Sequence, residues 1–340
     1  MPSTKADVFQ ACQALFPAWS ELSLDDFELD DPKGFSSFTM GVRAKPSVQP
    51  LEPDAVLFRK LEDKDNAVLD FDAERDVYET LAREGIAAEP YHYDRSIRVE
   101  AFYRGRTLEA EDLFEAETLQ KIADQLYRLH QLRPERLPAG SFWDMAVEKW
   151  GRLAQRVLVD QIDAFPAEEQ ALCEELREIF SEETAALVKS CIPAGDLTFC
   201  HNDTYHGNIM KLDTGEIRLL DFEFSCLNNR AYDFSNLFAE TVMKHKQPEY
   251  PYFRIAEPEF GDREFQIMIE AYFSNEPFGT EADREAASEG LLADIKMMLP
   301  LSHYKYAMAA LPLALEPIQK IRFIPYAHQR FMKFRELCAV

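Results

Sequence analysis

Short apolar runs separated by turn residues dominate the first hundred positions of the chain. Residues 55–58 and 97–102 are apolar runs bounded by proline, glycine and charged residues, which is typical of strands. The segment 72–84 instead has its apolar residues at helical spacing, and Gly85 follows it where a helix end favours glycine. The pattern predicts a β-rich N-terminal region, residues 1–103, with one helix.

After residue 103 the apolar period changes to that of a helix. Residues 119–129 form an amphipathic stripe, and the rest of the chain is predicted to be chiefly helical. Because the chain exceeds the usual length of one domain, we expect a second lobe over residues 104–340 and an α+β fold of two lobes. Further helices are predicted at 167–189, 289–315 and 318–337, the second bent or broken by its prolines.

Composition and charge exclude several classes of protein. Hydrophobic residues make up 46% of the chain, which is too apolar for a disordered protein. Asp and Glu number 61 against 37 Lys and Arg, so the net charge of −24 disfavours a nucleic-acid partner. The six cysteines are scattered without a CxxC pair, which fits reduced thiols in the cytoplasm better than a disulfide scaffold or zinc ribbon. The sequence contains no apolar run of membrane-spanning length.

Polar residues gather at the ends of a short β-rich insert, residues 197–220. His201, Asp203 and Asn208 have the spacing of the His-x-Asp-x-x-x-x-Asn catalytic loop of protein kinases, and Asp221 falls where those kinases carry the Asp of Asp-Phe-Gly. Each residue alone would be an ordinary turn residue, but the set at these offsets predicts phosphoryl transfer.

The chemistry explains the spacing. A carboxylate, Asp203, accepts or orients the proton of the attacking hydroxyl. The amide oxygen of Asn208 and the carboxylate of Asp221 supply oxygen ligands for Mg²⁺, which prefers few protein ligands together with phosphate oxygens and water. An alternative takes His201, Asp203 and His206 as the metal ligands of a hydrolase, because imidazole and carboxylate suit zinc or iron.

Two longer segments identify a family resemblance. Residues 199–210 resemble the catalytic loop of choline/ethanolamine kinases, and residues 220–240 resemble the longer second signature of that family. The family is related to the aminoglycoside phosphotransferases and has a protein-kinase-like fold. The resemblance implies a β-rich N-terminal lobe, a larger helical C-terminal lobe, ATP and Mg²⁺ as cofactors, and phosphorylation of a small amino alcohol as the first step of phospholipid head-group synthesis.

The resemblance also assigns the nucleotide site. Residues 33–38 resemble an altered form of the family's glycine-rich phosphate loop, and residues 56–59 resemble its strand with a basic residue for the phosphates of ATP. Arg59 then replaces the lysine of kinases, although an exposed salt bridge is the plainer interpretation of one Arg in a charged segment. The residues implied in nucleotide binding are Ser36, Ser37, Arg59, Glu74 as the ion-pair partner of Arg59, and Glu100 and Phe102 at the adenine hinge.

The acceptor site is implied by the C-terminal part of the chain. Tyr306 and Tyr326 resemble residues of the aromatic cage that holds the substrate's ammonium group, and Glu240 adds a counter-charge. His245 stands where a cage tyrosine is expected, and Ala309 where a second tryptophan is expected. A thinner cage favours ethanolamine or another amino alcohol over choline. Two alternatives remain: a kinase of another alcohol such as an aminoglycoside, and an ATP-binding pseudokinase. A homodimer is compatible with the resemblance.

Overall fold

The computed structural model describes residues 4–31, 38–61, 69–137, 140–245, 247–315 and 321–339. The chain divides into two compact units. Unit 1 comprises residues 1–105 with 134–136, and unit 2 comprises residues 106–133 with 137–340. Each unit has its own sheets and helices, so the two are described separately.

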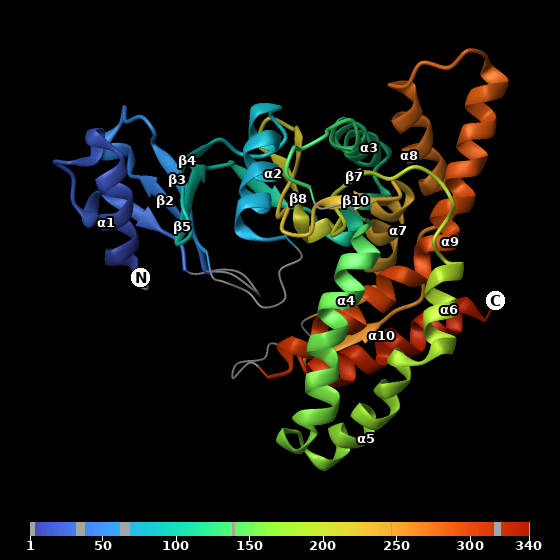
Figure 1. The fold of residues 1–340 in the computed structure, drawn as a ribbon. Helices are drawn as coiled ribbons and strands as arrows, with labels where there is room; N and C mark the ends of the chain where they lie inside the picture. Colours follow the sequence, from blue (N-terminus) through green and yellow to red (C-terminus); the bar gives the residue numbers. More distant parts are fainter. Residues whose placement is uncertain are drawn as a thin grey trace. The chain divides into compact units, whose positions relative to one another are not determined.

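Unit 1 is built on a five-stranded antiparallel sheet with the strand order β1-β2-β3-β5-β4 (Figure 1). The strands are β1 (Phe27–Leu29), β2 (Phe38–Ala44), β3 (Ala55–Lys60), β4 (Pro90–Tyr93) and β5 (Ile97–Ala101). Strands β3 and β5 thus confirm the predicted apolar runs. Alternate residues of β2 and β3, such as Val42 and Phe58, are buried in a core shared with helix α1 (Lys5–Leu15).

Helix α2 (Phe71–Arg83) confirms the helix predicted in this region. The Asp70 side chain caps its first turn by accepting a hydrogen bond from the Ala73 N–H, and Gly85 follows its end with a φ of 67°. Helix α1 was not predicted, because its apolar residues do not form a pronounced stripe in the sequence. It buries Val8, Phe9 and Cys12.

Unit 2 is chiefly helical. Every residue of helix α7 (Ala231–Ala239) is buried. Figure 1 shows α9 and α10 packed along each other, with α4 beside α9. The helices are α3 (Ala116–His130), α4 (Phe142–Gln155), α5 (Ala167–Leu176), α6 (Glu182–Ser190), α7 (Ala231–Ala239), α8 (Asp262–Ser274), α9 (Glu281–Leu313) and α10 (Phe323–Cys338).

Small sheets carry the polar insert. Strand β6 (Gly105–Thr107) neighbours β8 (Ile209–Leu212), which pairs with β9 (Ile217–Leu219). Strand β7 (Thr198–Cys200) pairs antiparallel with β10 (Cys226–Asn228). A third pair, β11 (Met243–His245) with β12 (Phe253–Ile255), follows α7. The β-rich insert predicted at residues 197–220 is confirmed by β7, β8 and β9.

Two helix predictions need correction. The long helix predicted over 167–189 is two helices, because a 3₁₀ turn (Arg177–Phe180) intervenes and Ser181 caps α6 by accepting a hydrogen bond from the Thr184 N–H. Helix α9, predicted over 289–315 as bent or broken, begins earlier, at Glu281, and is not broken at Pro300 or Pro312. Within the described ranges, no helix is both long enough and apolar enough to cross a membrane.

Candidate active site

The predicted catalytic loop connects strand β7 to strand β8, which belongs to a different sheet. Asn202 has a φ of 63° and Asp221 a φ of 64°, a left-handed conformation that side-chain-bearing residues seldom adopt. Asn202 is held there because its Nδ2 donates to the Phe224 carbonyl at 2.9 Å, and its Oδ1 accepts from Asn228 at 2.7 Å. Backbone strain of this kind concentrates at functional sites.

Asp203 is held from both sides. Its Oδ2 accepts a hydrogen bond from Asn208 Nδ2 at 2.8 Å. Its Oδ1 accepts from the Tyr306 hydroxyl at 2.7 Å and forms an ion pair with the Lys305 ammonium. The Asp203 side chain is 13% exposed. These contacts fix the orientation of a partly accessible carboxylate, which is what a group that positions a reacting hydroxyl requires.

A second carboxylate, that of Asp233, holds the backbone of the loop. Asp233, at the start of α7, accepts from the backbone N–H of His201 at 2.8 Å and of Asn202 at 2.7 Å. Its Oδ2 also lies 3.0 Å from His130 Nε2. Burial acts to raise the pKa of Asp233, but the hydrogen bonds and charge of His130, with those of His201, hold the pKa below its usual value. The loop conformation therefore depends on an ionised, buried carboxylate.

Asn208 directly precedes β8, and Asp221 follows shortly after β9, the strand that pairs with β8. The Leu220 N–H donates to the Asn208 carbonyl at 2.8 Å, which places Asp221 directly after this pairing. The pKa of Tyr205 is raised by burial and then by the negative charges of Asp203 and Asp221. Because Asn208 Nδ2 donates to Asp203, Oδ1 is the atom of this amide that the predicted metal site would use. One amide oxygen and one carboxylate form a donor set that fits Mg²⁺.

The hydrolase metal site proposed as an alternative finds little support in the geometry of His201. Its Nε2 lies 2.9 Å from the Leu220 carbonyl, and its Nδ1 accepts the Asp203 N–H at 3.2 Å. Both ring nitrogens therefore have protein partners. A second group of residues could also hold a metal ion, because the potential ligand atoms of His130, Cys200 and Asp233 all lie within 4.8 Å of one another. The His130 nitrogens and the Asp233 oxygens already bond within the protein, so this cluster supports the loop.

The predicted acceptor residues surround a buried arginine. Arg330 Nη2 lies 2.5 Å from Glu240 Oε1 and 2.8 Å from the Tyr326 hydroxyl. Its guanidinium carbon lies 4.8 Å from the ring centre of Tyr306 and 5.1 Å from that of Tyr326. The His245 ring stacks on Tyr326 at 6.2 Å. The structure thus brings Glu240, His245, Tyr306 and Tyr326 together, with Tyr306 reaching Asp203.

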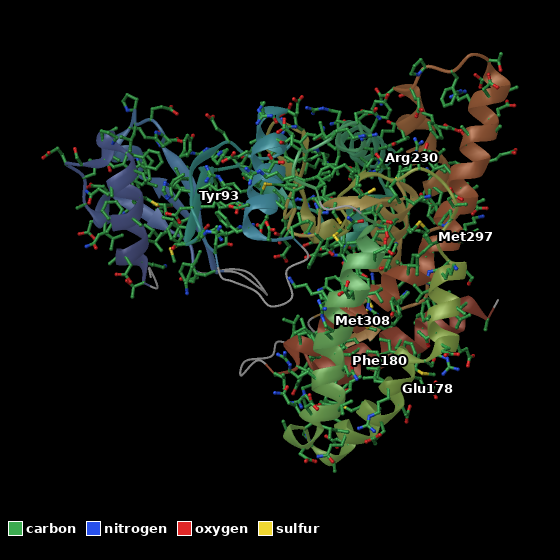
Figure 2. The ribbon with its side chains drawn as sticks, viewed as in Figure 1. Tyr93, Glu178, Phe180, Arg230, Met297 and Met308 are labelled. Atoms are coloured by element: carbon green, nitrogen blue, oxygen red, sulfur yellow. The ribbon has the colours of Figure 1, made fainter. Side chains whose placement is uncertain are left out.

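The predicted nucleotide residues that the structure describes lie in unit 1. Glu100 is buried and accepts from the Tyr78 hydroxyl and from Arg98 Nε, each at 2.6 Å. Glu74 accepts a long hydrogen bond, 3.4 Å, from Tyr93, which Figure 2 labels.

Four predicted nucleotide residues remain, and the structure describes two of them, Arg59 and Phe102. Arg59 lies on β3 opposite residue 98 of β5, and the Arg43 guanidinium lies 5.2 Å from the ring centre of Phe102. Ser36 and Ser37 fall outside the described residues.

Comparison with known proteins decides the family. The family model for choline/ethanolamine kinases matches residues 34–335. The chain belongs to the choline/ethanolamine kinase family. A probable choline kinase 2 of Arabidopsis thaliana is 29% identical over 70% of this chain and 64% of its own length. Choline kinase alpha of Mus musculus is 24% identical over 69% of this chain and 53% of its own length. The chain thus matches less than two thirds of the length of these two relatives.

Solved structures of family members share the fold. Choline kinase from Cryptosporidium parvum aligns with a TM-score of 0.75 at 21% identity, covering 97% of this chain and 94% of that one. Ethanolamine kinase from Plasmodium vivax aligns with a TM-score of 0.68 at 19% identity, covering 96% and 87%. At these identities the likeness establishes the protein-kinase-like fold, which confirms the predicted fold class.

Three charged residues of this kinase-family site were not assigned a role from the sequence. Asp233 is part of the second signature, but its support of the loop depends on the fold. Arg330 contacts Glu240, which lies ninety positions earlier, so its role depends on the fold. Lys305 had a signal that could have found it: it is a lysine inside an otherwise apolar helical segment, and such a residue is buried only with a partner.

Proposed function

We propose that this protein transfers the γ-phosphate of ATP to the hydroxyl of a small amino alcohol, with Mg²⁺ as cofactor. The observation that supports this most strongly is the geometry of Asp203. Its carboxylate is bonded to Asn208, a predicted metal ligand, on one side and to Tyr306, a predicted acceptor residue, on the other. One carboxylate therefore joins the groups that would hold metal and acceptor.

In the proposed reaction, the acceptor hydroxyl binds at Asp203 and passes its proton to the carboxylate as its oxygen attacks the γ-phosphorus of ATP. The bond from this phosphorus to the β–γ bridging oxygen breaks, and ADP leaves. Tyr306, Lys305 and Asn208 keep the carboxylate from rotating, so little reorganisation is needed when the hydroxyl arrives. Asn208 and Asp221 would hold Mg²⁺, which neutralises charge on the phosphates when bound.

The other assignments stay predictions. Ser36, Ser37 and Arg59 would contact the phosphates, Glu74 would orient Arg59, and residues 100–102 would face adenine. Names of relatives include choline kinase and ethanolamine kinase, which favours an amino alcohol over an aminoglycoside as the acceptor. The six free thiols are compatible with a cytoplasmic enzyme.

The test is coupled ADP release with choline, ethanolamine and an aminoglycoside, each with and without Mg²⁺. We expect turnover of an amino alcohol that is abolished by chelating the metal. Asp203→Ala is expected to lower kcat by about 10² to 10⁴-fold in a protein that still folds by circular dichroism but is less stable, because the buried Lys305 ammonium loses its ion-pair partner. Asp213→Ala, an exposed aspartate of the β8–β9 turn, is the matched control and should be fully active.

Two outcomes would contradict the proposal. A pseudokinase would bind ATP and release no ADP with any acceptor. Near-wild-type turnover by Asp203→Ala would remove this carboxylate from the mechanism.

A further inference from the structure

Lys305 is a buried lysine at the predicted reaction centre. It lies on α9, and its side chain has 0% exposure. Its ammonium donates to the Asn202 carbonyl at 2.8 Å and to Asp203 Oδ1. It also lies 4.2 Å from the ring centre of Tyr306. Burying an ammonium group is costly unless it is paired, so this lysine and Asp203 depend on each other.

A second ion pair lies against the same tyrosine. Arg330 and Glu240 are both buried, with side-chain exposures of 0% and 4%, and the guanidinium also contacts the Tyr306 ring. Tyr306 thus has a protein cation from each pair within contact distance, Lys305 at 4.2 Å and Arg330 at 4.8 Å. An aromatic face next to a fixed cation holds a second, mobile cation less well, because like charges repel.

The charges of this cluster are already balanced within the protein. Among these four described side chains, the two carboxylates are matched by two cations. His303 accepts a hydrogen bond from Arg330 through Nδ1, so it adds no positive charge in that state. The nearby Asp221 is the predicted metal ligand, so its charge serves the metal. A cationic acceptor would therefore bring one positive charge that no carboxylate of the cluster is left to match.

We propose that Lys305 determines acceptor specificity, by supplying from within the protein the positive charge that a cationic acceptor would otherwise bring. The acceptor is then recognised mainly by its hydroxyl and its shape. The substrate class widens to small primary alcohols whether or not they carry an ammonium group. This inference rests on the proposed function, since it concerns the acceptor of that reaction.

The first test uses the wild-type protein and two acceptors of the same shape. Choline is compared with its neutral carbon isostere, in which a tert-butyl group replaces the trimethylammonium group. We expect kcat/KM for choline to exceed that for the isostere by less than about thirtyfold, the discrimination that one good desolvated cation–aromatic contact would give. A larger preference for choline would overturn the inference.

The second test changes Lys305. Lys305→Gln keeps a donor for the Asn202 carbonyl and removes the charge, which leaves Asp203 uncompensated. We expect the ratio of kcat/KM for choline over the isostere to rise about tenfold or more, chiefly through a lower KM for choline. Lys305→Arg keeps the charge and should keep the wild-type ratio.

Controls separate the possible results. Lys296→Gln removes an exposed lysine from the same helix and should change neither the ratio nor kcat. Lys305→Gln could lower kcat equally for both acceptors and leave the ratio of kcat/KM for choline over the isostere unchanged. In that case Lys305 only supports the loop, and this inference fails while the proposed function stands. If Lys305→Gln does not fold, the wild-type ratio decides. If the wild type turns over neither choline, ethanolamine nor the isostere, the proposed function fails and the inference with it.

Discussion

Asp233→Asn is the change that most directly tests how the catalytic loop is held. The substitution preserves shape and volume and alters only charge and hydrogen bonding. Asp233 Oδ1 accepts from the Asn202 N–H at 2.7 Å, and Oδ2 accepts from the His201 N–H at 2.8 Å. An asparagine has a single oxygen, so one of these backbone donors must face its NH₂ group.

The expected magnitude follows from that mismatch. A hydrogen bond to a charged group contributes about 1.5 to 3 kcal/mol, and a buried donor left without an acceptor costs about 1 to 3 kcal/mol. Because Asp233 is fully buried, solvent cannot replace the lost bond. We expect the free energy of unfolding to fall by about 3 to 5 kcal/mol, a large share of the usual 5 to 15 kcal/mol. The loop that carries Asp203 should lose its position, so kcat should fall as well.

Urea denaturation of wild type and variant, followed by circular dichroism, measures the change, and ADP release measures kcat. Asp262→Asn is the matched control, because Asp262 pairs with Lys296 at the surface with 63% of its side chain exposed. Its loss should stay below about 1 kcal/mol. If Asp233→Asn loses no more than this control and retains kcat, the loop does not depend on the charge of Asp233.

Three further predictions concern other parts of the chain. A methyl group added by Gly207→Ala would overlap the Tyr205 ring, so we expect a stability loss of about 1 to 3 kcal/mol and a reduced kcat, measured by denaturation and ADP release. Burial, and then nearby positive charge, lowers the pKa of His303 well below its usual 6.5, so the stability that its neutral form contributes is complete above about pH 6.5 and is lost as the pH falls towards the folded-state pKa. Between pH 7.5 and 5.5, His303→Gln should therefore lose less unfolding free energy than the wild type. An equal loss in both proteins would exclude His303 as the cause. Arg98→Met would leave the buried Glu100 carboxylate without its ion-pair partner, so the free energy of unfolding measured by urea denaturation should fall by about 3 to 5 kcal/mol. Adding Glu100→Gln should recover part of this loss, whereas no recovery would indicate an unrelated packing defect.

The elements that the sequence predicted best are those whose local pattern agrees with their tertiary environment. Strand β3 and helix α2 have strong patterns, and each buries apolar residues of its pattern. The split of residues 167–189 was missed because charged helix formers continue through the break, while the Ser181 cap that starts α6 depends on a single hydrogen bond. Helix α9 continues through the buried Pro300 because the packing around it outweighs the tendency of proline to end a helix.

At the candidate site, spacing identified the residues of one continuous loop but could not identify partners supplied from elsewhere. Asp203 and Asn208 are five positions apart, and their hydrogen bond follows from the loop itself. Lys305 reaches the same carboxylate from a helix a hundred residues later, and Asp233 reaches the loop backbone from α7. Contacts of this range depend on the packing of α7 and α9, which periodicity does not encode.

The register of α10 has a consequence for how sequences of this family can change in length. Tyr326 and Arg330 lie one helical turn apart, and Arg330 Nη2 donates both to the Tyr326 hydroxyl and to Glu240 Oε1. A single inserted residue between Phe323 and Tyr326 would rotate everything after it by about 100°, carrying both groups away together. Insertions and deletions that accumulate during divergence should therefore be excluded from the first turn of α10, while single-residue length changes beyond Arg330 leave this pair in place.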